Sequence, residues 1–336
     1  MIGMMMVRCT GKDHIEFKVE EDKQQIQVLI DGDLFTSYIY PEQIKKPVLW
    51  PVISPEGNML TRSYPLVIKE GERTDHPHHV GVWFNYGDVN GLDFWNNSEA
   101  RAPEDRHMYG SIRHLSVEKA EGGKGTAELS TRSEWLTPDN KVLLSEQTGF
   151  HFIVDDQLRI IDRTAILEAM VDTVWFRDNK EGMFAIRVAR ELELPSEGET
   201  ELVDAHGNIT VVESSDNTAV SGNYRSADGV EGSDVWGTRC RWMKLHGTIN
   251  GEKVSLVIID HPSNPGYPTY WHARGYGLFA ANTLGQKVFS NGSQELNFYL
   301  TRGQRATFRY RLVAASEDLS DAQINRMADD FATTGE

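Results

Sequence analysis

The sequence has little cysteine and no long apolar run. Its two cysteines, Cys9 and Cys240, are too few for a disulfide framework, which leaves a single bridge between them as the only option. The Cys-x-x-Cys spacing typical of zinc sites does not occur. No stretch approaches the roughly 18 apolar residues that a membrane span needs. The apolar start at residues 1–7 lacks the basic leading region and cleavage site of a signal peptide. We therefore expect a soluble, cytoplasmic protein with no membrane partner.

Positive charge is also scarce. The 336 residues include 34 Lys and Arg against 50 Asp and Glu, which gives a net charge of -16 at pH 7. No basic stripe is available to neutralise phosphates, so nucleic acid is excluded as a partner. Glycine-rich nucleotide loops, a Gly-x-Ser-x-Gly elbow and a cysteine-based nucleophile are all missing, which argues against kinases, esterases and nicotinamide enzymes. The remaining partners are a small molecule and further copies of the chain, as in a homo-oligomer.

Short segments in which apolar and polar residues alternate dominate the chain and predict strands. Asp31-Gly32 and Asn250-Gly251 separate pairs of such segments and predict hairpins. Proline interrupts residues 48–53, which predicts an edge strand or a bulge there. The pattern as a whole predicts an all-β fold, a large antiparallel β-sandwich. The predicted strands are 14–20, 25–30, 34–40, 48–53, 64–69, 80–86, 111–119, 125–136, 147–154, 158–167, 171–176, 183–194, 209–213, 239–249, 253–260, 276–282, 295–301 and 305–314.

The predicted organisation is a single sandwich domain over residues 1–336. A polar, glycine-rich stretch at about 195–235 interrupts the strand pattern and is predicted to be a long excursion. A C-terminal helix is predicted at about 320–333, because Ser320 and Gln323 form a capping box. The apolar side chains that follow share one helical face: Ile324, Met327, Ala328 and Phe331.

The first functional signal is a histidine cluster. His76, His78 and His79 fall within four positions and precede an apolar, β-prone run. Because Pro77 restricts His76 to extended geometry, the segment is predicted to rise into a strand, with His76 and His78 on one face and His79 on the other. Burying such a cluster without partners would cost stability. The cluster therefore indicates a site, although His79 taken alone is better explained as a hydrogen-bonded structural residue.

The second functional signal is the stretch 260–274. Asp260 and His261 follow an apolar strand, three prolines stiffen the loop after them, and His272 and Arg274 close it. Prolines lower the entropy that is lost when a loop is ordered. A rigid loop that carries an acid, two histidines and an arginine is typical of a binding or catalytic site.

Together these residues favour acid-base chemistry on a sugar. His76, His78 and His261 are the candidate catalytic acids or bases, and Asp260 is the candidate orienting carboxylate. Tryptophan rings offer flat faces for sugar rings, while amide, guanidinium and carboxylate groups bind hydroxyls. If Arg187 is buried it needs an anionic partner, for which Asp260 or Glu181 would serve. The candidate substrate-binding residues are Trp83, Asn85, Trp95, Glu181, Arg187, Asn264, Trp271, His272, Arg274 and Asn282.

Two alternatives stay open. His76, His78 and His261 offer the three nitrogen ligands of an open zinc or iron site, although the acid-base hypothesis requires no cofactor. The chain could instead be a non-catalytic carbohydrate-binding protein, in which the tryptophans matter and the histidines do not.

Several motifs resemble the DUF6807 family, which is also labelled methane oxygenase PmoA-like. The resemblance spans roughly residues 15–315. It is carried by Asp75-His76-Pro77-His78-His79, Gly81, Trp83-Phe84, Asp260-His261-Pro262-x-Asn264, Tyr267-Pro268-x-x-Trp271-His272-x-Arg274, Tyr276-Gly277 and Ala281-Asn282.

The resemblance implies a β-supersandwich similar to galactose mutarotase and a carbohydrate ligand, and hence a sugar isomerase, epimerase, mutarotase or lyase. Members usually carry arginine after the double histidine, where this chain has Val80. Any role of that arginine in binding an acidic group is therefore not carried over. The oxygenase label implies a copper-binding membrane protein, and without a membrane span we expect no methane oxygenase activity.

Overall fold

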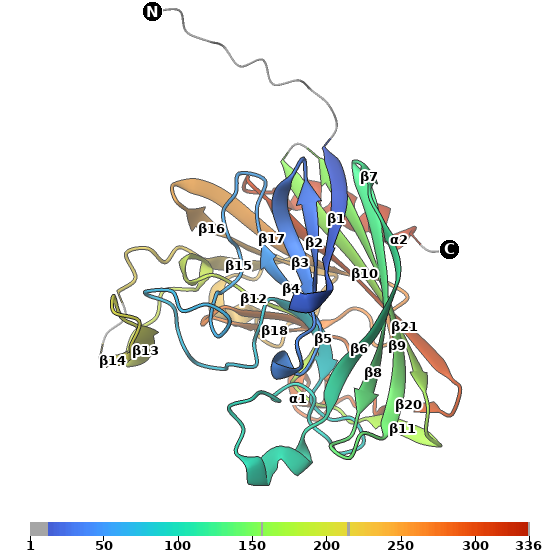
Figure 1. Ribbon diagram of the computed structural model, residues 1–336. Helices are drawn as coiled ribbons and strands as arrows, with labels where there is room; N and C mark the ends of the chain where they lie inside the picture. Colours follow the sequence, from blue (N-terminus) through green and yellow to red (C-terminus); the bar gives the residue numbers. More distant parts are fainter. Residues whose placement is uncertain (1–12, 156, 214–215, 335–336) are drawn as a thin grey trace, which may run out of the picture.

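Two large antiparallel sheets pack face to face in the computed structural model, which describes residues 13–155, 157–213 and 216–334 (Figure 1). The predicted all-β antiparallel sandwich with a C-terminal helix is confirmed. In spatial order the nine-stranded sheet contains β18 (Tyr270–Arg274), β19 (Leu278–Asn282), β12 (Gly182–Arg187), β5 (Val82–Tyr86), β4 (Val48–Val52), β3 (Asp33–Ile39), β2 (Gln25–Ile30), β1 (His14–Glu20) and β7 (Gly123–Lys124). The eight-stranded sheet contains β15 (Asn223–Ser226), β16 (Trp242–Ile249), β17 (Glu252–Asp260), β21 (Arg305–Ala315), β10 (Leu158–Ala169), β9 (Val142–Asp155), β8 (Thr126–Leu136) and β6 (Ser111–Glu121).

Shorter elements complete the described chain. Two hairpin-sized sheets pair β11 (Thr173–Phe176) with β20 (Phe298–Thr301), and β13 (Thr200–Val203) with β14 (Ile209–Val212). The α-helices are α1 (Gln286–Phe289) and α2 (Asp321–Ala332). The 3-10 helices are η1 (Glu21–Lys23), η2 (Glu42–Ile44), η3 (Pro103–Met108), η4 (Arg190–Leu192) and η5 (Gly232–Val235). None of the helices formed by the described residues has the length and apolar character that crossing a bilayer requires.

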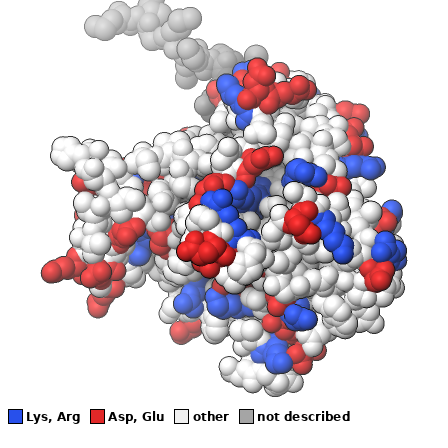
Figure 2. All heavy atoms as spheres, turned by 60° about the horizontal axis from the view of Figure 1, so that its bottom comes forward, with Lys and Arg blue, Asp and Glu red and all other residues white. Residues whose placement is uncertain are grey.

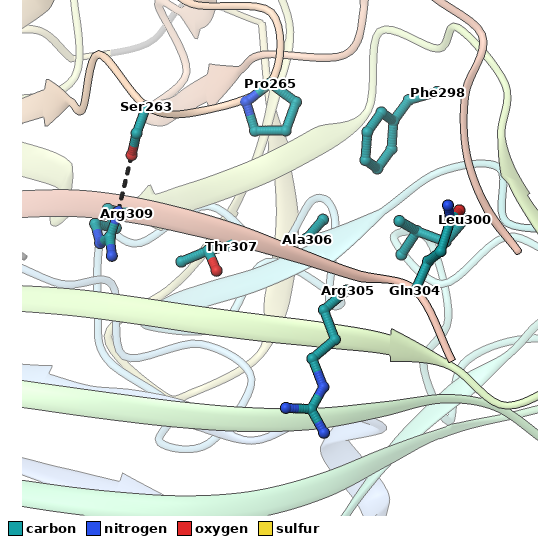
Figure 3. Close-up of a pocket in the computed structure, with 9 residues that line it drawn as sticks. All are labelled: Ser263, Pro265, Phe298, Leu300, Gln304, Arg305, Ala306, Thr307 and Arg309. Carbon is teal, nitrogen blue, oxygen red and sulfur yellow. Dashed lines mark hydrogen bonds between the residues drawn. The ribbon is translucent and has the colours of Figure 1, made fainter. Parts of the chain in front are cut away.

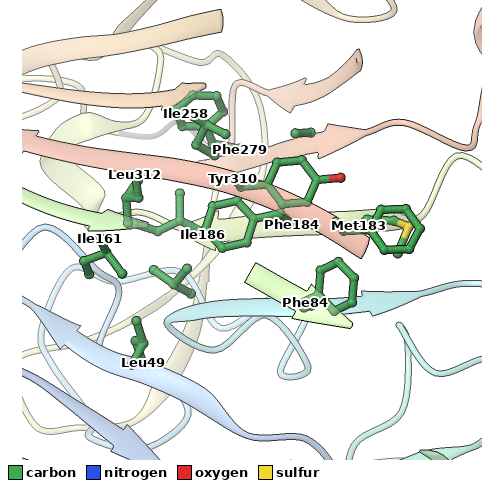
Figure 4. Close-up of a cluster of buried hydrophobic side chains, with 14 of the residues drawn as sticks. Leu49, Phe84, Ile161, Met183, Phe184, Ile186, Ile258, Phe279, Tyr310 and Leu312 are labelled. Atoms are coloured by element: carbon green, nitrogen blue, oxygen red, sulfur yellow. The ribbon is translucent and has the colours of Figure 1, made fainter. Parts of the chain in front are cut away.

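The main core fills the space between the two sheets (Figure 4). The core forms because apolar and polar residues alternate along the strands, and every second side chain of a strand points inward. Phe184 of β12 stacks on Tyr310 of β21 with ring centroids 5.0 Å apart, and Phe84 of β5 packs near both. This contact ties the site-bearing strands of one sheet to the centre of the other.

The outer faces of the two sheets are covered differently. Helix α2 lies on the eight-stranded sheet and buries Ile324, Ala328 and Phe331 there, as the predicted apolar face requires. Its capping box at Ser320 and Gln323 is confirmed. Loops cover the outer face of the nine-stranded sheet instead. These loops carry the histidine cluster.

Three strand predictions need correction. Residues 64–69 form a turn because the N–H groups of Ser63 and Tyr64 donate to the buried Glu72 carboxylate and need no strand partner. Strand β4 lies inside its sheet rather than at the edge, and the other predicted possibility, a bulge at its proline, is confirmed by the register shift in its pairing with β3. Residues 270–274, predicted to close a loop, form the edge strand β18.

The stretch at about 195–235 is partly excursion and partly sheet. The β13–β14 hairpin projects from the sandwich at the left of Figure 1. Strand β15, at residues 223–226, returns to the eight-stranded sheet as its edge strand. Acidic side chains gather on the side where the hairpin projects, and elsewhere on the face in Figure 2 acidic and basic side chains are interspersed.

Cys240 is a buried free thiol, and burial raises its pKa to about 11. Cys9 and the apolar start at residues 1–7 lie outside the described residues, so the predictions about a bridge and a signal peptide stay predictions.

Candidate functional site

The candidate site lies on the outer face of the nine-stranded sheet. Four residues form a row across adjacent strands there: Trp83 of β5 pairs with Ala185 of β12, which pairs with Ala280 of β19, which pairs with His272 of β18. Neighbouring strands are about 4.8 Å apart, so Trp83 and His272 stand at the two ends of a row with only two methyl groups between them. The short alanines leave room above the sheet for the rings described below.

The loop that carries the histidines is shaped by the buried Arg62. Its guanidinium donates to the carbonyl oxygens of Asp75 (2.7 Å), His76 (2.9 Å) and His79 (3.1 Å). The N–H of His79 also donates to the His76 carbonyl, at 2.9 Å, which closes a turn. His76 consequently has φ +47°, so the predicted extended geometry and shared strand face are wrong. The convergence of these carbonyls on Arg62 outweighs the local preference that Pro77 imposes.

Asp75 is the charge centre of the loop. Its carboxylate accepts from Arg187 Nη2 (2.6 Å), from Arg62 Nη1 (3.0 Å) and from His76 Nδ1 (2.6 Å). Burial alone would raise the pKa of Asp75, but the His76 hydrogen bond and the two guanidinium charges outweigh it and hold the pKa below its ordinary value. Arg187 is fully buried, and its predicted anionic partner is therefore Asp75 rather than Asp260 or Glu181.

His76 lies flat on two other rings. Its centroid is 4.9 Å from that of His79 and 4.9 Å from that of Tyr276, and the planes are parallel within 5°. The His79 and Tyr276 centroids are only 6.5 Å apart. Of the His76 side chain, 41% is exposed.

The other two histidines of the cluster are buried and uncharged at neutral pH. Burial, with the nearby charge of Lys46, lowers the pKa of His78 to about 2. Burial likewise lowers the pKa of His79 well below its ordinary value. His79 Nε2 accepts from the indole N–H of Trp95 at 3.2 Å, so His79 is held by hydrogen bonding, as its structural interpretation predicts. His78 Nε2 has no partner.

Lys46 is a buried cation that the sequence did not single out. Its Nζ donates to the His78 carbonyl at 2.7 Å and lies 5.5 Å from the centre of the Trp83 ring. Burial lowers the pKa of Lys46 to about 7. No motif marks this lysine, because it approaches the cluster from a distant loop.

Glu181 and His272 form the far side of the site. Glu181 Oε2 lies 3.5 Å from His272 Nδ1, and Nδ1 has no hydrogen-bond partner. Burial, then the charges of Lys180 and Arg274, lowers the pKa of His272 to about 3. The charge of a protonated His76 would lower the pKa of His272 further, because the two imidazoles lie on the same side of the sheet.

Buried polar atoms without a protein partner concentrate on this face. Two belong to neighbouring residues of β5, Trp83 Nε1 and Asn85 Oδ1, and two to the histidines His78 and His272. Buried polar groups are nearly always hydrogen-bonded, so these unpartnered atoms indicate that a ligand or ordered water binds here. The set contains a donor and an acceptor, which suits a hydroxyl-rich molecule.

The second Asp-His-Pro motif lies elsewhere. His261, at the end of β17, packs edge-on against Phe331 of α2 with centroids 5.1 Å apart, on the outer side of the eight-stranded sheet. Asp260 is fully buried and accepts from Asn264 Nδ2 (2.7 Å) and from the Thr269 N–H (2.8 Å). The structure therefore places His261 on the opposite side of the sandwich from His76 and His78, and it buries Asp260 in hydrogen bonds to its own loop.

Several candidate substrate-binding residues have structural contacts instead. Asn264 holds the loop to β21 through the N–H and C=O of Arg309. Trp271 points into the main core and donates to the Cys240 carbonyl at 3.2 Å. Asn282 is buried and donates to the Asn179 carbonyl at 2.8 Å. Trp95 is fully buried behind His79. Only the last part of the second motif, His272 and Arg274, reaches the site.

The expected metal ligands do not converge. His76 and His78 have ring centroids 5.6 Å apart, and His261 lies on the other side of the molecule. Across residues 13–155, 157–213 and 216–334, no group of three or more His, Cys, Asp or Glu side chains is arranged to hold a metal ion.

A cavity of about 470 Å³ lies beside the second motif (Figure 3). Ser263 Oγ on its wall accepts from Arg309 Nη1 at 2.9 Å and lies 2.7 Å from His261 Nδ1. Among the described lining residues, none has a buried polar atom without a partner. The polar groups of this cavity are thus already satisfied, unlike those on the nine-stranded sheet.

Solved structures with similar folds share little sequence. The galactosidase domain of an alpha-galactosidase-sucrose kinase, AgaSK, is 7% identical with a TM-score of 0.42, and the match covers 91% of this chain and 42% of that chain. A galactose mutarotase-like protein from Clostridium acetobutylicum is 9% identical with a TM-score of 0.37 and coverages of 91% and 100%. A galactose mutarotase related enzyme from Lactobacillus acidophilus is 10% identical with a TM-score of 0.29 and coverages of 91% and 98%.

No curated protein matches the sequence significantly. The profile of the family of unknown function DUF6807 matches residues 25–329, most of the chain. The resemblance that the two Asp-His-Pro motifs indicated is thereby confirmed. This chain belongs to the DUF6807 family.

Proposed function

We propose that this protein performs acid-base chemistry on a carbohydrate, as a sugar epimerase, mutarotase or lyase. The observation that carries the proposal is the His76–Asp75 pair. The His76 side chain is 41% exposed, and its Nδ1 is fixed at 2.6 Å from a carboxylate that two buried arginines hold in place.

The pair is suited to move a proton. Since Asp75 stays ionised, it accepts the Nδ1–H of His76 and leaves the lone pair of Nε2 at the exposed edge of the ring. When Nε2 takes a proton, the imidazolium that forms is stabilised by the same carboxylate. Imidazole is the side chain whose ordinary pKa allows both steps near neutral pH.

Glu181 with His272 supplies the second polar group. Burial raises the pKa of Tyr276 to about 12, and the charges of both Glu181 and Asp75 act on this phenol. His76 stacks on the Tyr276 ring with centroids 4.9 Å apart. A sugar bound beside His76 would have the Glu181–His272 pair as a second polar group, as proton transfer at two points requires.

The choice of a carbohydrate rests on the lining. The face combines aromatic rings with an unpartnered indole donor on Trp83 and an unpartnered amide acceptor on Asn85. Sugar hydroxyls donate and accept, and sugar rings pack on aromatic faces. A non-catalytic carbohydrate-binding role is the second candidate, because burial lowers the pKa of both His78 and His79 and leaves these two histidines of the cluster uncharged.

Proton exchange tests the proposal directly. A panel of monosaccharides is incubated with the protein in D₂O, and ¹H NMR follows loss of carbon-bound protons and the approach of anomers to equilibrium. His76→Gln should slow turnover by about 10²- to 10⁴-fold, the usual contribution of a general acid or base. His261→Gln is the matched control and should stay within about threefold of wild type.

The outcomes separate the candidates. Equal rates in wild type and His76→Gln would remove His76 from the mechanism. Sugar binding without any exchange in wild type would establish the binding protein instead of the enzyme.

A further inference from the structure

The geometry points to a negatively charged sugar, one that bears a carboxylate or a phosphate, as the ligand, with Arg274 as the residue that binds the acidic group. This inference rests on the proposed function and specifies the ligand of the same site. Arg274 lies at the end of β18, on the same face as His272.

Arg274 is exposed and has no anionic partner. Of the carboxylates that the structure describes, none lies within 4.0 Å of its guanidinium. Buried arginines of the same region are paired, such as Arg187 with Asp75 and Arg190 with Glu193. Arg274 is therefore available to a ligand.

An aromatic ring holds this arginine in place. The Arg274 guanidinium lies 5.6 Å from the centre of the Trp236 ring, which packs edge-on against Phe289 at 5.4 Å. Trp236 is 38% exposed, so the pair forms part of the rim of the site. Contact with a ring face leaves the N–H edge of a guanidinium free, and that edge matches a carboxylate or a phosphate with two parallel hydrogen bonds.

A second unpaired cation flanks the other side of the cluster. Arg101 donates to the Asn96 carbonyl at 2.8 Å and stacks over Tyr109, and no described carboxylate is within 4.0 Å of it either. Its charge acts on His78, as that of Arg274 acts on His272. The site is thus flanked by uncompensated positive charge in a chain whose net charge is -16.

The acidic residue nearest to this region does not fill the role. Glu181 is engaged by Lys180 and by His272. A ligand anion would pair with Arg274 while one of its hydroxyls meets the unpartnered Nδ1 of His272, two residues earlier on the same face of β18. A neutral sugar would meet His272 and leave the arginine unpaired.

Calorimetric titration distinguishes these ligands. Wild type is titrated with D-glucose and D-galactose, with their uronic acids and with their 6-phosphates. We expect one acidic series to bind about tenfold or more tightly than the neutral sugars, since charge-assisted hydrogen bonds are the strong ones. Arg274→Gln should reduce this preference to about threefold or less. Arg302→Gln, which alters an exposed arginine paired with Asp172, should leave it unchanged.

Every outcome decides something. A preference for uronic acids identifies a carboxylate ligand, and a preference for 6-phosphates identifies a phosphate ligand. Neutral sugars that bind as tightly as acidic ones overturn the inference and leave the proposed function intact. A preference that survives Arg274→Gln overturns the role of Arg274. Absence of binding by every sugar in the wild type overturns both this inference and the proposed function.

Discussion

The tripeptide Asp-His-Pro occurs twice in this chain, and its two copies have opposite properties. At residues 75–77 the aspartate faces two guanidinium groups and the histidine is 41% exposed. At residues 260–262 the aspartate is buried among neutral donors, and the histidine, 4% exposed, packs on Phe331. The same three residues thus make an ionised dyad in one place and a loop anchor in the other. What differs is whether buried arginines donate to the aspartate: Arg62 and Arg187 donate to Asp75, whereas the buried Arg311 beside the second motif pairs with Asp162.

The largest expected effect comes from removing a buried arginine beside the first motif. Arg187→Gln should lower the free energy of unfolding by about 3–5 kcal/mol, because it leaves Asp75 and the neighbouring Glu193 with less buried positive charge. Urea denaturation measures the change. Arg309→Gln, beside the second motif, is the matched control and should cost less than about 1 kcal/mol, since the guanidinium of Arg309 donates to a neutral hydroxyl, that of Ser263. Equal losses would mean that the two motifs are held in the same way.

The second test uses pH. The folded-state pKa of Asp75 is lowered, so its stabilisation is present above the unfolded value of 3.8 and is lost as pH falls. The folded-state pKa of Asp260 is raised from 3.8 to about 7, so its stabilisation is present below pH 3.8 and is lost as pH rises through 7. Asp75→Asn should therefore be most destabilising at pH 7, and Asp260→Asn near pH 4. The Asp260→Asn difference should change by about 2–4 kcal/mol between pH 4 and pH 7, whereas the Asp75→Asn difference should be nearly constant there and shrink below pH 4.

Chemical denaturation of both variants and wild type at pH 2.5, 4, 5.5 and 7 measures these profiles. Parallel profiles for the two variants would contradict the contrast.

The smallest test truncates the histidines. His261→Ala should lower the free energy of unfolding by about 1–2 kcal/mol, because it opens a gap against Phe331 under helix α2. His76→Ala should cost less than about 1 kcal/mol, since its side chain is partly exposed. Thermal unfolding followed by circular dichroism compares the two, and a greater loss for His76→Ala would reverse the assignment of roles.

Much of the fold could be predicted from the sequence because its signals are local. The Asp31-Gly32 and Asn250-Gly251 turns do connect β2 to β3 and β16 to β17. The capping box of α2 also depends only on neighbours. Strand β18 was missed because three prolines precede it and because its inward residues, Trp271 and Ala273, alternate with polar ones that looked like parts of a loop.

The site was predictable in its residue types and only partly in its assembly. The sequence singled out His76, Glu181, Arg187, His272 and Arg274 by residue type, and the structure brings them to one face of the nine-stranded sheet. The sequence could not separate Asp260 and His261 from them. The burial of Asp260 and His261 depends on the sheet to which β17 belongs, and this is decided by its long-range pairing with β21. The backbone turn at His76 likewise depends on a side chain outside the motif.

The role of Arg62 has a consequence for recognising related proteins by sequence. Arg62 donates to three carbonyl oxygens of the histidine loop and lies 13 or more positions before them in the sequence. The conformation of the loop therefore depends on a residue outside it. A sequence pattern that requires the histidines alone would also match chains that contain the same motif but do not form the turn. A pattern that requires the distant arginine as well would select chains able to build the dyad.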